Sequence, residues 1–374
     1  MAWTHRERVL AALNHEEADR VPIDLGGCFS TGMYFTAYPP LMQHLGLAHE
    51  NATLPKPRRT AVLAPSLLER FDIDTRFTGL GAYDDSHGEI DEDTFLDEWG
   101  VTWQKVGDGP YLDEHGPFSD GKPTIEDLEA YQFPDPGNPG YLRGVGDRAA
   151  AHRKKTDCAV VLNLRYGIVH QGMFLRGFTN WLKDLHKNRE FISRMMELIA
   201  DYWVQLATNA LDEVGNNVDL VYVGDDLAMQ TGPMFNPEIY REIIKPHHRR
   251  MFETIKSRGL KIIYHSCGAV APLIDDLIDV GVDALNPVQV NASNMDPNDL
   301  KEAFGDRISF WGGIDTQKLL PFGTPDEVRA EVRRIISILG KDGGYVLNSV
   351  HNLQPDVPSE NIVAMFDEAR AHRY

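Results

Sequence analysis

Residues 259–270, GLKIIYHSCGAV, contain the pattern that decides the fold. The β-branched run over 261–264 predicts a short buried strand, and Gly268 marks the turn that follows it. His265 and Cys267 therefore lie where the strand gives way to a loop. Side chains two positions apart on an extended chain point to the same side, so this imidazole and this thiol can converge on one point. Convergent nitrogen and sulfur donors indicate a zinc site.

The same pattern, an apolar run that ends in polar or glycine residues, recurs along the chain. With the first example it gives eight predicted strands, at 19–27, 71–77, 158–167, 218–226, 260–267, 282–288, 308–315 and 343–352.

Stretches with helical periodicity lie between most of these runs, at 179–214, 237–259, 271–281, 296–305 and 324–343. Strands that alternate with helices predict parallel pairing, and eight such units predict an α/β fold of the (β/α)₈ TIM-barrel type. An open doubly wound sheet is the alternative. Thr4 and Glu7 have the spacing of a capping box, which predicts an opening helix that ends near Asn14. We interpret 1–374 as a single barrel domain.

One segment interrupts the alternation. Residues 82 to about 157 are acidic and rich in glycine, proline and aromatic residues. We expect this insertion near the barrel mouth to form a lid or wall, with Trp99 and Trp103 facing a ligand; a small separate core or an interaction surface is the alternative.

The composition excludes several classes of protein. The chain has 374 residues, of which 42% are hydrophobic, and 37 basic against 56 acidic residues give a net charge of −19. So acidic a surface argues against nucleic acid and anionic membranes as partners. No signal-like segment or long apolar run occurs, so a cytosolic location is expected. The three cysteines, Cys28, Cys158 and Cys267, are too few and too far apart for a disulfide framework.

Polar side chains gather at the predicted strand ends, which in a barrel all face one mouth. Asp225 and Asp226 should point in opposite directions, one toward the cavity as acid or base and the other as a helix cap; capping by both is the alternative. Arg165 and Tyr166 are expected to reach the substrate, Tyr166 as a catalytic group, although Arg165 could instead pair with either aspartate. The substrate-binding set also includes Asn163, Asn286 and Trp99.

A third zinc ligand must come from elsewhere in the chain. His351 ends the last predicted strand, and three protein ligands would leave a fourth position open, as in catalytic zinc sites. Asp225, Asp226 and Glu98 are the alternatives. The pair at 247–248 lies in the basic stretch KPHHRR and is interpreted as a solvated helix face.

Four segments carry a resemblance to a known family: 4–27, 265–289, 310–328 and 343–362. Over nearly the whole chain the sequence resembles the uroporphyrinogen decarboxylase superfamily, which implies a (β/α)₈ barrel. The resemblance implies one of two activities. The first is metal-independent decarboxylation of porphyrinogens. The second is zinc-dependent methyl transfer with corrinoid proteins and thiol or aryl-ether partners.

Two departures from the family patterns choose between these branches. The decarboxylases carry Arg-Gln-Ala-Gly-Arg after the first strand, whereas DLGGCFSTGMYFTAY at 24–38 has no arginine to bind substrate carboxylates. The methyltransferases carry His-x-Cys after the fifth strand, matched by His265 and Cys267, and a further cysteine after the eighth, where this chain has His351. Imidazole in place of thiolate makes the site less electron-rich, which slightly favours methyl ethers over thiols.

The sequence therefore predicts a zinc-dependent methyltransferase that acts between a small methyl donor or acceptor and a corrinoid (cobalamin) on a separate protein; a homodimer is compatible with the sequence. Two rivals remain. One is a metal-independent decarboxylase or lyase that uses Asp225 or Asp226 with Tyr166 and Arg165. The other is a non-catalytic barrel that binds a ligand.

Overall fold

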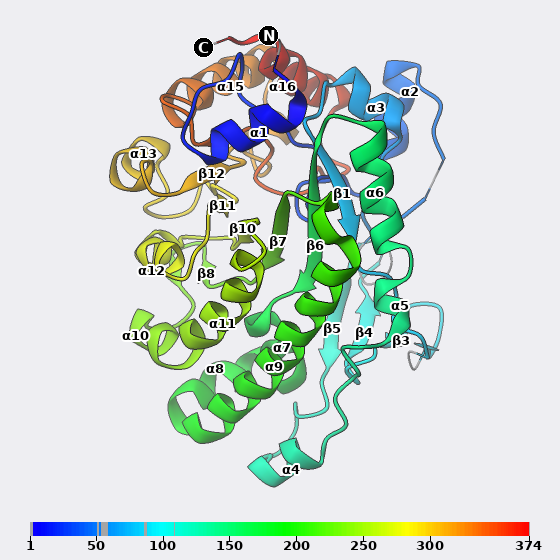
Figure 1. The fold of residues 1–374 in the computed structure, drawn as a ribbon, viewed down its shortest axis with the longest axis vertical. Coiled ribbons are helices and arrows are strands. Elements are labelled where there is room, and N and C mark those ends of the chain that lie inside the picture. The colour runs from blue at the N-terminus through cyan, green and yellow to red at the C-terminus, as the bar shows by residue number, and fades with distance from the viewer. Residues whose placement is uncertain (1–2, 51, 54–58, 86–87, 108, 374) are drawn as a thin grey trace.

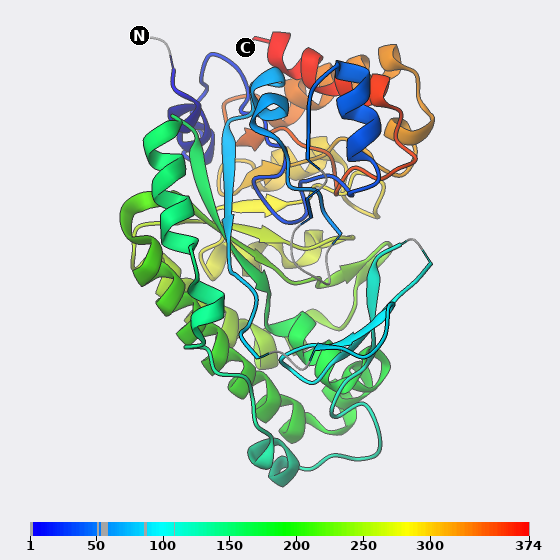
Figure 2. The same ribbon diagram turned by 90° about the vertical axis from the view of Figure 1, so that its right-hand side faces the viewer.

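The computed structural model describes residues 3–50, 52–53, 59–85, 88–107 and 109–373. The molecule is an α/β protein built on a curled parallel sheet with helices outside it (Figure 1). Both termini lie at one end of the molecule, and α4 lies at the opposite end (Figures 1 and 2). Among the described residues, none of the helices is long and apolar enough to cross a membrane.

The main sheet has seven strands, all parallel to their neighbours. They are β1 (Thr75–Gly79), β6 (Ala159–Tyr166), β7 (Leu220–Gly224), β10 (Lys261–His265), β11 (Ala284–Asn286), β12 (Ser309–Trp311) and β13 (Tyr345–Val346). Their order in the sheet is their order in the chain. A doubly wound sheet would reverse direction at a switch point, so this alternative is wrong.

The first predicted strand, at 19–27, is reduced to a short link between the two edges of the sheet. Ile23 bridges Leu347 in parallel, and the Asp74 amide donates to the Ile23 carbonyl beside β1. Pro22 has no amide hydrogen to donate, and Gly26 turns the chain at φ +75°. The segment is therefore too short for a regular strand, yet it hydrogen-bonds to both edges.

Two apolar layers hold the sheet. Residues that alternate toward the inside form one cluster with α1, which covers the end of the sheet where the strands begin; its members include Val161, Leu220, Tyr222, Ile263 and Trp311. The residues between them face outward into the larger layer beneath the helices. Strands that are buried on both faces explain the continuous apolar runs in the sequence.

The helices surround the sheet in chain order. Opening helix α1 (His5–Leu13) has the predicted capping box of Thr4 and Glu7 and ends at Asn14. The other α-helices are α2 (Tyr38–Leu45), α3 (Pro65–Arg70), α4 (Ile125–Ala130), α5 (Pro139–Leu142), α6 (Val145–Lys155), α7 (Ile168–Arg176), α8 (Phe178–Lys187), α9 (Arg189–Val214), α10 (Pro237–Ile239), α11 (Lys245–Lys256), α12 (Ile274–Asp279), α13 (Pro297–Phe304), α14 (Leu319–Phe322), α15 (Pro325–Leu339) and α16 (Ser359–Ala371). Two 3₁₀-helices, η1 (Gly215–Asn217) and η3 (Ala271–Leu273), and a π-helix, η2 (Tyr240–Ile244), complete the helical elements of the described residues.

The predicted insertion contains an antiparallel sheet of its own. Its strands are β2 (Gly88–Glu89), β3 (Thr94–Leu96), β4 (Thr102–Lys105) and β5 (Tyr111–His115), and β8 (Ala228–Met229) pairs with β9 (Gly232–Pro233) elsewhere. Figure 2 shows this cyan sheet standing apart from the parallel sheet. Helix α6 falls within the predicted range 82–157 but packs on β1 and β6, like the other helices of the barrel.

Candidate active site

The structure brings the three predicted metal ligands together at the carboxyl ends of the strands. His265 ends β10, Cys267 follows it, and His351 lies in the loop after β13. One ligand atom from each lies within 4.8 Å of the other two. His265 Nε2 is 3.3 Å from Cys267 Sγ, and the two imidazole rings are 5.6 Å apart between centroids.

A chain of hydrogen bonds fixes the orientation of His265. Its Nδ1 lies 2.6 Å from Asn286 Oδ1, an acceptor that also takes a bond from the Ser30 hydroxyl. The Tyr222 hydroxyl donates to Ser30 in turn, and Asn286 Nδ2 donates to the Trp311 carbonyl. Because an amide oxygen cannot donate, Nδ1 carries the proton and the lone pair of Nε2 faces Cys267.

The three side chains fit a zinc ion. Two imidazoles and one thiol are donors that zinc prefers, and a metal-binding histidine typically donates its other ring N–H to a fixed acceptor, as His265 does to Asn286. Burial and the nearby Asp226 carboxylate raise the pKa of the Cys267 thiol well above its usual value. A divalent cation would offset both effects and favour the thiolate. Three protein ligands leave room for a substrate atom.

The two adjacent aspartates point in different directions. Asp226 lies beside the cluster: its Oδ1 accepts from the Cys267 amide at 2.6 Å and lies 3.9 Å from His265 Nε2. Asp225 is fully buried and accepts from the amides of Val169 and His170 at the start of α7. One carboxylate thus lies beside the clustered ligands and the other caps a helix, but the capped helix precedes the pair in sequence.

His170 was not predicted as a site residue, yet it lies beside both aspartates. His170 Nδ1 donates to the Gly224 carbonyl, and its Nε2 is 3.5 Å from Asp226 Oδ2. Burial lowers the pKa of His170, but its hydrogen bonds to Asp225 and Asp226 outweigh this effect and raise it to about 10. The signal available in the sequence was its position, four residues after the end of a strand.

The expectation that the 247–248 pair is a solvated helix face is wrong for His248. This side chain is fully buried, and its Nε2 lies 3.0 Å from Asp225 Oδ2. Its Nδ1 is 3.1 Å from the Tyr240 hydroxyl. The basic residues next to His248 indicated an exposed helix face, but His248 lies on the buried side of α11. The same two histidines, His170 and His248, hold the Asp225 pKa down at about 2 against the effect of burial.

Arg165 and Tyr166 turn toward the insertion. Arg165 Nη1 lies 3.0 Å from Glu98 Oε1, so its ion-pair partner is neither Asp225 nor Asp226. The Tyr166 ring stacks with Trp103, at 6.1 Å between centroids, and tilts against His170 at 5.9 Å. Tyr166 therefore lies between the insertion and the side chains around Asp226.

The other predicted substrate residues are buried. Asn163 is fully buried; its amide accepts from the Phe29 backbone and donates to the carbonyls of Gly27 and Thr78. Asn286 uses its amide to position His265. Trp99 is 4% exposed and packs edge-on against Tyr202.

The alternative third ligands are placed less well than His351. Glu98 is engaged by Arg165 and by the Tyr141 hydroxyl, and Asp225 is used by the backbone of α7. Asp226 borders the cluster without being one of its three members.

Comparison with known proteins agrees with this arrangement. A model of the family "Uroporphyrinogen decarboxylase (URO-D)" matches residues 110–372. The chain belongs to the URO-D family. Among curated members, the uroporphyrinogen decarboxylase of Alkalilimnicola ehrlichii is 23% identical over 98% of this chain and 94% of its own length. That of Thermus thermophilus is 29% identical over 34% of this chain, a match that spans only 35% of the Thermus enzyme.

A solved structure described as a methyltransferase from Methanosarcina mazei has the URO-D-like fold of this chain. It is 19% identical, with a TM-score of 0.70, and the match covers 98% of both chains. The two chains thus share one fold along almost their entire length.

Proposed function

We propose that this URO-D family member is a zinc-dependent methyltransferase. It would transfer a methyl group between a small substrate, with a methyl ether favoured over a thiol, and a corrinoid carried by a partner protein. The observation that carries the proposal is the convergence of His265, Cys267 and His351 at the strand ends. The likeness to a methanogen methyltransferase supports it.

The segment after Ile23 argues against porphyrinogen decarboxylation. Residues 24–38 contain no arginine, and Gly27 to Met33 are buried. A substrate with many carboxylates would need guanidinium partners to balance its charge. Of the two aspartates that the rival decarboxylase could use, Asp225 is hydrogen-bonded to His248 and to backbone amides, and Asp226 accepts from the Cys267 amide.

Each residue around the cluster has a distinct task in this proposal. His265, Cys267 and His351 would hold zinc, which supplies Lewis acidity toward the substrate heteroatom when bound. Asn286 keeps Nε2 of His265 turned toward the cluster. Asp226 accepts the Cys267 amide hydrogen and sets the position of that residue. His170 donates from Nδ1 to the Gly224 carbonyl, and its protonated Nε2 faces Asp226. This positive charge stabilises the carboxylate beside the cluster.

Methyl transfer from an ether provides the direct test. The zinc-loaded protein is mixed with 2-methoxyphenol and cob(I)alamin, the latter standing in for the corrinoid protein. The O–CH₃ bond breaks, a Co–CH₃ bond forms, and the phenolate takes a proton from water. We expect methylcobalamin and 1,2-dihydroxybenzene to appear with the wild type and with the control Cys158→Ala, but only at background level with Cys267→Ala. Equal rates in chelator-treated wild type, or CO₂ release from a porphyrinogen, would contradict the proposal.

A further inference from the structure

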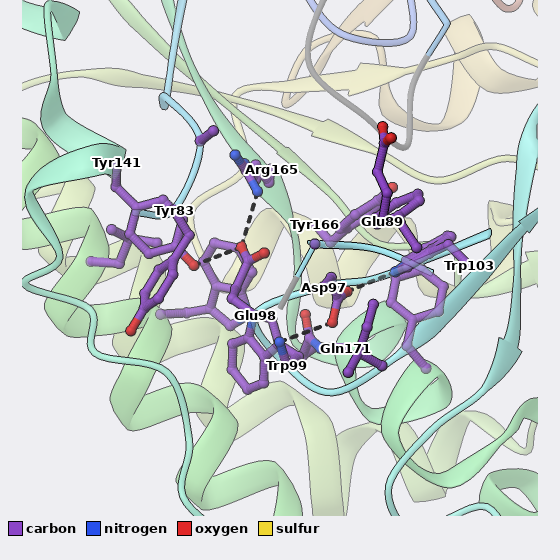
Figure 3. Close-up of a pocket in the computed structure, with 17 residues that line it drawn as sticks. Tyr83, Glu89, Asp97, Glu98, Trp99, Trp103, Tyr141, Arg165, Tyr166 and Gln171 are labelled. Carbon is purple, nitrogen blue, oxygen red and sulfur yellow. Dashed lines mark hydrogen bonds and ion pairs between the residues drawn. The ribbon is translucent and has the colours of Figure 1, made fainter. Parts of the chain in front are cut away.

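A cavity lies between the insertion sheet and the parallel sheet with its helices, apart from the three clustered ligands. It encloses about 240 Å³ and is bounded by β3, β4, the end of β6, α7 and α9. Figure 3 shows Trp103 and Tyr166 on one side of it and the ion pair of Arg165 and Glu98 on the other. Its aromatic walls come from Phe95, Trp99, Trp103, Tyr166 and Phe174.

The size and walls of this cavity suit one substituted ring. A dry cavity of about 150 Å³ with apolar walls is enough to bind benzene. Trp103 is nearly parallel to Tyr166 and to Phe95, with interplanar angles of 13° and 9°. The faces and edges of the rings that line the cavity favour a planar aromatic guest through stacking and edge contacts.

The charges around the cavity favour a neutral guest. Arg165 is the only cationic side chain among the described lining residues, and it is paired with Glu98. Burial raises the pKa of Asp97 to about 6, although Trp103 Nε1 donates to it. A carboxylated guest would meet three acidic side chains, Glu89, Asp97 and Glu98, and no uncommitted cation.

We propose that this cavity is a binding site for a neutral aromatic compound that packs against Trp103, Tyr166 and Phe174. The site is distinct from the clustered ligands, since Tyr166 and His170 lie between the cavity and Asp226. It does not depend on zinc or on methyl transfer.

Calorimetry with 2-methoxyphenol, on full-length protein treated with a chelator, tests the site separately from the proposed function. We expect one molecule to bind per chain, with benzoate at least about tenfold weaker. Phe174→Ala removes one aromatic wall of the cavity and should weaken binding by roughly 3- to 10-fold, the usual range for one aromatic contact. The exposed Phe178→Ala on α8 is the matched control and should bind like the wild type.

Leu96→Trp, which narrows the cavity, should abolish binding while circular dichroism shows an intact fold. Three results would overturn the proposal: no binding to the wild type, unchanged affinity in both cavity variants, or benzoate binding as tightly as 2-methoxyphenol. Because the metal is absent throughout, failure of the methyl-transfer assay leaves these outcomes unaffected.

Discussion

Asn286 decides which nitrogen of His265 is available to a ligand. Its Oδ1 receives both His265 Nδ1 and the Ser30 hydroxyl, and its Nδ2 is anchored on the Trp311 carbonyl. The amide therefore cannot turn over without losing several bonds at once. These bonds give Asn286 a positioning role, and its expected contact with substrate stays a prediction.

Replacing Asn286 by Ala should weaken zinc binding without removing a ligand. Loss of the acceptor frees the His265 ring to rotate, and losses of this kind usually cost about 10- to 100-fold in metal affinity. Competition with a chromophoric chelator measures the change. Ser30→Ala, which leaves Asn286 in place, should cost less; equal affinities for the wild type and Asn286→Ala would show that His265 is not oriented in this way.

His170 should make stability depend on pH. Its pKa is about 10 in the folded protein against 6.5 for an ordinary histidine, because the bonds to Asp225 and Asp226 outweigh burial. A raised pKa stabilises the fold fully below pH 6.5, and this contribution is lost as the pH rises toward 10. The stability advantage of the wild type over His170→Gln should therefore shrink between pH 6.5 and 10 in urea unfolding. The exposed His186→Gln serves as the control, and a constant advantage across this range would refute the assignment.

At the scale of elements, α1 is locked to the sheet by a buried carboxylate. Asp74, just before β1, accepts from Arg8 Nη1 at 2.6 Å and from Arg20 Nη1 at 2.7 Å, and lies 2.7 Å from His5 Nδ1. Asp74 is fully buried, and the two arginines are 6% and 2% exposed. The Ile23 amide donates to the same carboxylate, so the network also holds the short link that joins the sheet edges.

Asp74→Ala should lower the free energy of unfolding by about 3–5 kcal/mol, because two buried guanidinium groups lose their buried partner and keep only a partly exposed carboxylate each, Asp19 for Arg8 and Asp72 for Arg20. Asp367→Ala breaks the more exposed pair with Arg70 and should cost less than about 1 kcal/mol. Urea unfolding of both variants gives the comparison. Similar losses in the two would mean that the buried network contributes no more than a surface ion pair.

The strands were predictable because their signal is local. Each apolar run is buried on both faces, and its position follows from the sequence alone. The ends of the strands could not be predicted in the same way. The predicted run 308–315 extends past the end of β12 at Trp311, because Gly312 and Gly313 take φ values of +108° and +106°. The interaction partners of Arg165, His170 and His248 could not be predicted either. Each partner lies on an element that is distant in sequence from the residue it contacts.

At the scale of the whole molecule, the site depends on closure of the sheet. His351 lies 84 positions beyond Cys267, and β13 is three strands away from β10 in the sheet order. Curling of the sheet brings the loop after β13 back to the end of β10. The sequence predicted that His351 lies near Cys267 only because the carboxyl ends of barrel strands all face the same side of the barrel.

Zinc content of the purified full-length protein tests the central claim most directly. After zinc loading and removal of excess metal, elemental analysis should find about one zinc per chain in the wild type and in Cys158→Ala. Cys267→Ala and His351→Ala should each retain far less, because either change removes one of three ligands. A wild type without zinc, or variants that keep a full equivalent, would contradict the assignment of His265, Cys267 and His351 as the metal site.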